Sequence, residues 1–188
     1  MANALPTQDE NNLILKIQKR IQTGAYSDIF RSADGTKVFK LFINCSHPTN
    51  VSQWLTMPEH DKQRRDTFDT ECDAYEIALK HPSILLHVPH FYGRVEISDV
   101  LDQEGNSVAC HYLLDCCYAI EYLDGDDVKL GSYSDEDIPP HLRDFIMAMQ
   151  AVGIAYVKDA SVFMPDDAEG FKIIDFATRE VEPPVYDV

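Results

Sequence analysis

Two apolar strands joined by an Asp-Gly turn constrain this chain most strongly. Residues 33–36 read Ala-Asp-Gly-Thr, and an Asp-Gly pair supplies the positive φ angles that tight hairpin turns require. The segment that follows, Lys37–Ile43, is rich in β-branched and aromatic residues, which favour strands. We therefore predict a hairpin of residues 27–32 and 37–43, preceded by a further strand over residues 13–22.

A helix and two more strands are predicted next. One helical face is marked by apolar residues at i, i+4, i+7 and i+11, namely Phe68, Cys72, Tyr75 and Leu79. The helix should cover about residues 58–80 and end at His81-Pro82, because the residue before proline disfavours the α region. Residues 90–98 and 108–123 read as strands separated by a turn-rich segment.

The C-terminal third is expected to be mainly helical. Residues 125–140 are acidic and predicted to be strand-free, and Pro139-Pro140 opens a second helix. Its apolar stripe is Leu142, Phe145, Ile146, Met149 and Val152, and Gly153 fits the C-terminal stop. A short hairpin of residues 161–164 and 171–174 follows. We predict an α+β fold: a loose segment at 1–12, a five-stranded antiparallel sheet with one helix at 13–123, and a smaller unit at 124–188.

The charge of the chain narrows the possible partners. Thirty-two acids against sixteen Lys and Arg give a net charge of −16, which disfavours binding to nucleic acid and favours a basic partner, if the charge does more than maintain solubility. No apolar run is long enough for a membrane helix, and the first ten residues lack the features of a secretory signal. Five cysteines without a CxxC pair suggest reduced thiols, so we expect a cytoplasmic protein.

Three other groups of residues predict little chemistry. His87, His90 and the Cys110-His111 pair do not have the spacing of a zinc site. Cys72, Cys116 and Cys117 lie in apolar patterns and are expected to be structural. An acidic cluster, Asp124, Asp126 and Asp127, could bind a basic substrate, although a solvated loop is the simpler interpretation.

Several residues follow the order of a nucleotide site. Gly24 lies between the first two strands, with Gln22 and Ser27 where a glycine-rich loop would have further glycines. Lys40 lies on the third strand, and Glu71 lies on the helix that follows, with Glu76 as the competing choice. Glu121, Leu123 and Gly125 follow the fifth strand, and Asp175-Phe176-Ala177 ends the last apolar segment.

In this order and spacing, residues 13–180 resemble the protein kinase superfamily. The resemblance implies a minimal protein-kinase-like fold that binds ATP and Mg²⁺. It implies that Lys40 pairs with the phosphates and is held by Glu71, and that Gly24 lets the backbone approach them. For the base, the resemblance implies that Ile29 and Val38 line the adenine pocket and that Ile120 is the gatekeeper. It also implies that the backbone of Glu121 and Leu123 forms hydrogen bonds with adenine. Asp175 would bind Mg²⁺.

The catalytic loop departs from the family pattern of H-R-D-x-x-x-x-N. If Asp159 is the base, Met164 stands at the Asn position and cannot bind Mg²⁺. If Gly153-Ile154 sets the register, Tyr156 replaces the His and Lys158 replaces the Asp. In a third register, a shortened loop puts Ser161 at the Asn position. These registers remain open.

Three functions are compatible with this sequence. The first is Mg-ATP-dependent phosphoryl transfer to a protein substrate, with Lys40 and Asp159 as catalytic residues. The second is a pseudokinase module that grips a protein partner, and the third is a kinase-like enzyme with different chemistry. The sequence ends shortly after Ala177, so we expect a truncated C-lobe without an activation segment, as in small effector-type kinases, some of which are delivered into a host cytosol.

Overall fold

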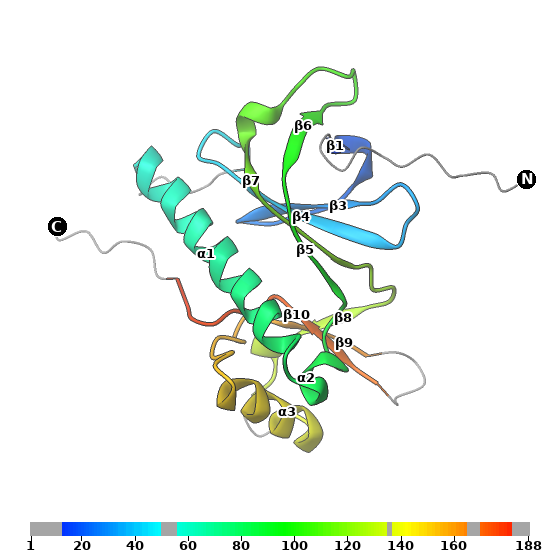
Figure 1. Ribbon diagram of the computed structural model, residues 1–188, viewed down its shortest axis with the longest axis vertical. Helices are drawn as coiled ribbons and strands as arrows, with labels where there is room; N and C mark the ends of the chain where they lie inside the picture. Colours follow the sequence, from blue (N-terminus) through cyan, green and yellow to red (C-terminus); the bar gives the residue numbers. More distant parts are fainter. Residues whose placement is uncertain (1–12, 50–55, 135–136, 165–169, 182–188) are drawn as a thin grey trace, which may run out of the picture.

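The protein is a mixed α+β structure. The computed structural model describes residues 13–49, 56–134, 137–164 and 170–181, so the expected loose segment at 1–12 lies outside the described residues. Strands and the long helix α1 (Met57–Ala78) form one part, and a smaller sheet with α3 (Pro140–Ala151) forms the other. Figure 1 shows α1 running beside the larger sheet toward the smaller part.

The larger sheet has five antiparallel strands, as predicted. Its order is β2-β3-β4-β7-β5, and the strands are β2 (Arg20–Thr23), β3 (Ser27–Arg31), β4 (Lys37–Ile43), β7 (Tyr112–Glu121) and β5 (Phe91–Val95). The predicted hairpin joins β3 to β4: Gly35 has a φ of 76°, and the Asp34 carboxylate accepts hydrogen bonds from the Thr36 amide and the Ser32 hydroxyl. The turn chemistry therefore sets the register of the two central strands.

Two predicted strands are each divided in the structure. Residues 13–22 form β1 (Leu13–Lys16), a short 3-10 turn (Ile17–Lys19) and β2, and residues 90–98 divide into β5 and β6 (Ile97–Leu101). β1 pairs in parallel with β6, away from the five-stranded sheet. Leu15 and Val100 thereby enter a second core cluster with Phe30 and Tyr112. The predicted strands divide because these side chains are buried in the second cluster. The alternation of residues in the sequence does not show which cluster a side chain enters.

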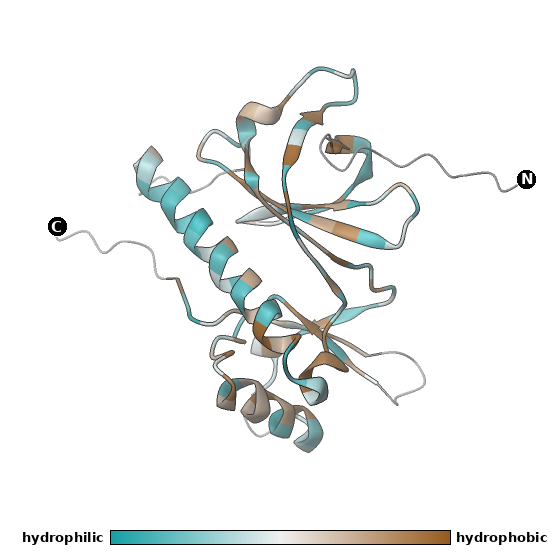
Figure 2. Cartoon of the chain, viewed as in Figure 1, coloured by the Kyte–Doolittle hydropathy of each residue, from teal (hydrophilic) through white to brown (hydrophobic). Residues whose placement is uncertain are grey.

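Helix α1 begins and ends close to the predicted residues. Thr56 and Glu59 form a capping box, in which the Thr56 amide donates to the Glu59 carboxylate at 3.0 Å. Figure 2 shows hydrophilic residues along much of α1 and hydrophobic residues in the strands beside it. Of the predicted stripe, Phe68, Cys72 and Tyr75 are buried, whereas Leu79 at the C-cap is 43% exposed. Proline 82 starts a second, four-residue helix, α2 (Pro82–Leu85), because its fixed φ suits a first helical position.

The C-terminal part contradicts two predictions. Within residues 125–140, β8 (Asp127–Lys129) pairs with β9 (Ser161–Phe163), which also pairs with β10 (Lys172–Ile174). This part is therefore not mainly helical: its described residues contain α3 and a three-stranded antiparallel sheet, β10-β9-β8. The predicted hairpin of residues 161–164 and 171–174 is confirmed as β9 and β10, whereas the three residues of β8 carry too little periodicity to be recognised. The predicted second helix is confirmed, and Gly153 ends it with a φ of 96°.

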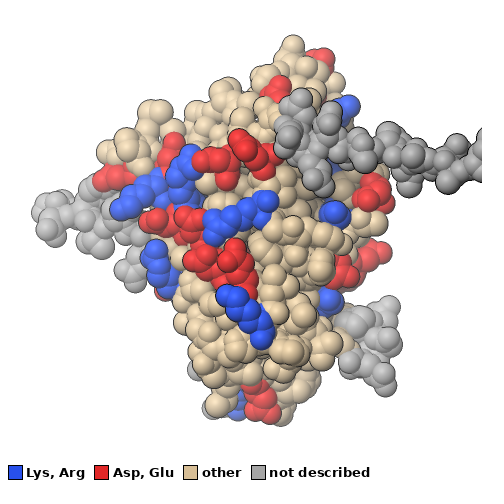
Figure 3. Space-filling model, in the orientation of Figure 1, with Lys and Arg blue, Asp and Glu red and all other residues tan. Residues whose placement is uncertain are grey.

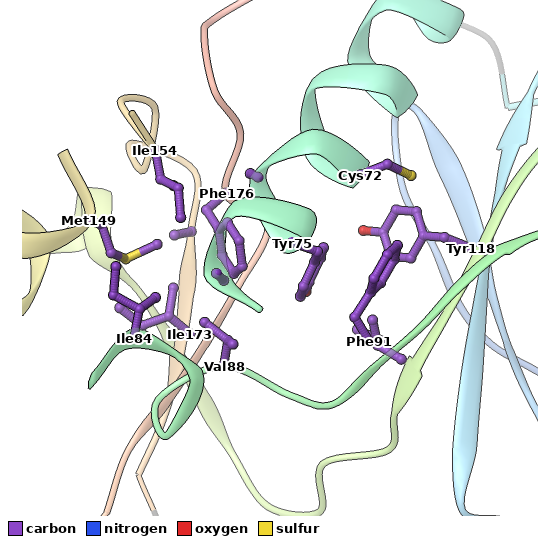
Figure 4. Packing of buried hydrophobic residues seen from close by; sticks show 14 of the residues in the cluster. Cys72, Tyr75, Ile84, Val88, Phe91, Tyr118, Met149, Ile154, Ile173 and Phe176 are labelled. Atoms are coloured by element: carbon purple, nitrogen blue, oxygen red, sulfur yellow. The ribbon is translucent and has the colours of Figure 1, made fainter. Parts of the chain in front are cut away.

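One aromatic cluster joins the two parts. Tyr75 of α1 stacks on Phe91 of β5 at 5.0 Å between ring centroids and contacts Phe176 after β10 at 4.6 Å (Figure 4). The Ile173 amide donates to the His87 carbonyl at 2.8 Å, which fixes β10 against the segment before β5. Cys72, Cys116 and Cys117 are buried, as predicted for structural thiols.

The face of the molecule that is seen in Figure 1 carries charges of both signs. Figure 3 shows acidic and basic side chains intermixed there. Arg94 lies near three carboxylates of α1, including Asp73 at 3.1 Å and Glu76 at 3.8 Å. No helix within the described ranges is long and apolar enough to cross a membrane.

Candidate functional site

A cavity of about 740 Å³ lies between the larger sheet, α1 and the smaller sheet. Its lining includes every residue that the sequence predicted for the site: Gly24, Ile29, Val38, Lys40, Glu71, Glu121, Leu123, Asp159 and Asp175. These residues come from the segment β2–β4, α1, the end of β7, and the segments at Asp159 and Asp175. Its volume falls within the range of roughly 300–1,000 Å³ that is typical of small-molecule sites.

Lys40 forms an ion cluster with two carboxylates in the cavity. Its Nζ lies 2.8 Å from Glu71 Oε2 and 3.0 Å from Asp175 Oδ1. The Tyr118 hydroxyl, on the neighbouring strand β7, donates to Glu71 Oε2 at 2.8 Å. The Lys40 and Glu71 side chains are each only 10% exposed, so solvent screens this pair weakly.

The competing carboxylate of the helix does not belong to this cluster. Glu76 has a half-exposed side chain and lies beside Arg94 on the surface. Glu71 faces the sheet because it shares a helical face with Phe68 and Tyr75, at three and four residues' distance. The structure therefore selects Glu71 as the partner of Lys40.

The cluster shifts the pKa of each member. Burial opposes the charge of Lys40, but the carboxylates of Asp175 and Glu71 outweigh it and raise the Lys40 pKa. Burial raises the pKa of Glu71 in spite of the opposing effect of Lys40. Burial also acts to raise the pKa of Asp175, but Lys40 and Lys129 together lower it. Lys40 is therefore held as a cation, and Asp175 as an anion.

Asp175 has an unusual backbone conformation. Its φ is 62°, in the left-handed region that residues other than glycine rarely adopt, and such strain is typical of functional sites. The next residues explain how the conformation is held. Phe176 is fully buried, and Ala177 exchanges two backbone hydrogen bonds with Tyr156, at 2.9 and 3.1 Å.

The loop at Gly24 is folded tightly against α1. The Gly24 amide donates to the Ser27 carbonyl at 2.8 Å, and an added Cβ would lie 3.2 Å from that carbonyl oxygen. Arg64 of α1 donates to the Ala25 carbonyl at 3.1 Å, and its guanidinium lies 3.7 Å over the Tyr26 ring. Any larger residue here would require the Ser27 carbonyl to shift by a few tenths of an ångström, because the backbone closes on itself.

The segment after β7 forms the opposite edge of the cavity. The Glu121 amide donates to the His90 carbonyl at 2.9 Å, so this amide is already engaged and is not available to a bound base. The Glu121 carboxylate accepts from the His90 amide and from Lys172 of β10, each at 3.1 Å. These bonds overcome the effect of burial and lower the pKa of Glu121. Its side chain therefore ties the two sheets together.

The predicted catalytic loop brings Asp159 to the cavity. The Tyr156 hydroxyl donates to Asp159 Oδ2 at 2.8 Å, and Lys158 also lines the cavity. Ser161 is buried in β9 and Met164 is 44% exposed, and neither is among the lining residues. Neither candidate for the Asn position therefore reaches the cavity.

Lys129 is a site residue that the sequence did not predict. Its Nζ lies 3.3 Å from Asp175 Oδ2 and 3.1 Å from the Asp159 carbonyl oxygen. The residue ends β8, the strand that was expected to be loop. Its signal was weak: Val128 and Leu130 flank Lys129 with a period of two, but over three residues only.

The residues present suit a nucleotide better than a magnesium ion. Ile29, Val38 and Ile120 give an apolar lining for a base, and Lys40 gives a cation for phosphates. At Asp175, however, each carboxylate oxygen accepts from a lysine ammonium. In the part of the chain that the structure describes, no group of three or more His, Cys, Asp or Glu could hold a metal. As arranged, the site does not fit the expected magnesium.

Comparison of the sequence with protein-family models and with curated proteins found no match.

Proposed function

We propose that this protein binds a nucleoside triphosphate, ATP in the first instance, in the cavity between its two sheets. The observation that carries the proposal is the buried cluster of Lys40, Glu71 and Asp175 in a cavity with apolar lining. A cation fixed between two carboxylates is placed for phosphate contact, and perturbed ionisable groups in a cavity are typical of functional sites. A base would occupy the apolar part beside Glu121 and Leu123.

A kinase-like architecture for this protein is part of the proposal. The strand order β2-β3-β4-β7-β5 suits it, with Lys40 on the third strand of that sheet along the chain and Glu71 on the following helix. The tight loop at Gly24 and the segment 121–123 lie at the cavity as such an architecture requires. Asp175 follows β10, close to Lys40.

Phosphoryl transfer is the reaction that we propose for the bound nucleotide. Asp159 lines the cavity and would accept the proton of an attacking hydroxyl, as a general base must lie within hydrogen-bond reach of its substrate. A protein substrate with basic residues would be attracted by the net charge of −16. A pseudokinase role is the second candidate, because neither Ser161 nor Met164 offers a ligand group to the cavity.

Ligand-dependent thermal unfolding tests the binding proposal. ATP at about 100 times its dissociation constant should stabilise the protein by about 2.7 kcal/mol, or roughly 5–11 °C for a chain of this size. AMP should give a smaller shift, and Lys40→Met should give none, each variant being compared with its own ligand-free state. Lys37→Met is the matched control, since Lys37 lies on the same strand over the Tyr92 ring and outside the cavity.

The outcomes separate the candidate functions. If neither ATP nor GTP shifts the wild-type protein, with or without magnesium, the proposed function is wrong. If ATP binds but no labelled phosphate reaches any protein, and Asp159→Asn binds ATP like the wild type, the pseudokinase role is favoured. Transfer that persists in Asp159→Asn would show that another group serves as the base.

A further inference from the structure

Lys129 occupies a position that a metal ion would need. Its Nζ lies 3.3 Å from Asp175 Oδ2. Lys40 Nζ lies 3.0 Å from the other carboxylate oxygen of Asp175, Oδ1. A Mg²⁺ ion requires oxygen ligands at about 2.0–2.1 Å in near-ideal octahedral geometry. A dication bound to Asp175 would therefore lie close to the Lys129 ammonium, and the two like charges would repel each other.

The backbone around Lys129 holds it at this position. Lys129 is paired with Ser161 across β8 and β9, and the Leu130 amide donates to the Ala160 carbonyl at 2.9 Å. An added Cβ on Gly131 would lie 3.2 Å from the Lys158 carbonyl, so the segment packs closely on the loop that carries Asp159. The ammonium has a second acceptor in the Asp159 carbonyl, at 3.1 Å. It is thus directed into the cavity by its strand and by two acceptors.

The Lys129 side chain is also free to follow a ligand. It is 53% exposed, in contrast to Lys40 at 10%, and an exposed ion pair contributes little to stability. The four-carbon stem of lysine lets the ammonium shift toward a bound phosphate while it stays beside Asp175. Lys40 and Lys129 would then contact a polyphosphate from two sides of Asp175.

From this geometry we infer that Lys129 supplies the positive charge that a divalent cation would supply, so that the cavity binds nucleotide polyphosphate without a metal. The inference rests on the proposed nucleotide site and names the group that completes it. It also accounts for the catalytic loop, in which the cavity receives no side chain from Ser161 or Met164. An ammonium needs no ligand set of its own, so the missing Asn would not prevent binding.

Calorimetric titration with ATP tests the inference, using wild type, Lys129→Ala and Lys129→Arg, each in EDTA and in magnesium. We expect the wild type to bind in EDTA with an affinity within about three-fold of that in magnesium. We expect Lys129→Ala to bind at least ten-fold more weakly in EDTA and to recover most of this loss in magnesium, because the ion can then approach Asp175. Lys129→Arg should resemble the wild type.

Lys80→Ala is the matched control, since it removes one exposed lysine outside the cavity and should leave both affinities unchanged. Binding of the wild type only in magnesium, or equal affinities of wild type and Lys129→Ala in EDTA, would overturn the inference and leave the proposed function standing. Absence of binding in both conditions would overturn the proposed function itself. The wild-type titration needs no variant, so it decides the question even if Lys129→Ala does not fold.

Discussion

Replacement of Lys40 by methionine should expose the energetics of the ion cluster. Methionine keeps much of the apolar stem but removes the ammonium, leaving Glu71 and Asp175 without their common cation. Breaking a buried pair by removing one partner costs about 3–5 kcal/mol, because a buried charge is left uncompensated. For a chain of this size the midpoint of thermal unfolding should fall by roughly 6–20 °C at neutral pH.

The cost of this substitution should depend on pH. Burial already raises the pKa of Glu71 above its ordinary value of 4.5, and loss of Lys40 removes the group that opposes this shift. A carboxyl group with a raised folded-state pKa contributes stability that is fully present below its unfolded pKa and is lost as pH rises through the folded one. The difference between Lys40→Met and wild type should therefore be small near pH 4.5 and largest near pH 8.

Urea unfolding followed by circular dichroism measures this difference, with Lys37→Met as the control on the same strand. The double variant Lys40→Met/Glu71→Gln should recover at least half of the lost free energy at pH 8, since it removes the stranded charge. A Lys40→Met protein within about 1 kcal/mol of wild type at pH 8 would refute the reasoning, because breaking a buried pair costs more than that. So would a difference that does not change with pH.

Two further substitutions test the surroundings of the cluster and the C-terminal end of α3. Tyr118→Phe removes the hydroxyl that donates to Glu71 at 2.8 Å. The free energy of unfolding, measured by urea denaturation, should fall by about 1.5–3 kcal/mol. A change below about 0.5 kcal/mol would mean that this bond is not formed. Gly153→Ala should cost at least about 1 kcal/mol because Gly153 has a φ of 96°, whereas Gly170→Ala, at a residue without positive φ and with open space around it, should be neutral.

Lys40, Glu71 and Asp175 could be predicted because their order and spacing resemble those of protein kinases, and the first two lie on long elements that the sequence also predicts. Lys40 shares one face of a seven-residue strand with Val38 and Phe42, and Glu71 shares a helical period with Phe68 and Tyr75. These two periods bring the pair together in a predictable way once the helix packs on the sheet. Asp175 could be predicted from the apolar strand before it, but its positive φ could not, since it depends on the burial of Phe176 and the bridge from Ala177 to Tyr156.

The parts that sequence reasoning missed depend on contacts between distant segments. β1 lies within the predicted strand 13–22, but its parallel pairing with Ile97–Leu101, more than eighty positions away in the chain, was not predicted. Lys129 enters the site because Asp127–Lys129 pairs with Ser161–Phe163. The three residues of β8 have almost no pattern of their own, and tertiary pairing decides their conformation. The catalytic-loop register stayed open for the same reason, because burial of Ser161 follows from β9.

The buried charges themselves favour a ligand over a purely structural role. Three ionised groups at Lys40, Glu71 and Asp175 must be removed from water as the protein folds, and well-packed apolar residues of similar volume often stabilise a fold as well or better. A structural need alone would also be met by ion pairs on the surface, such as those of Arg94 with Asp73 and Glu76. Here the charged groups instead face open volume that an apolar wall continues, so a ligand with an anionic and an apolar end can use both.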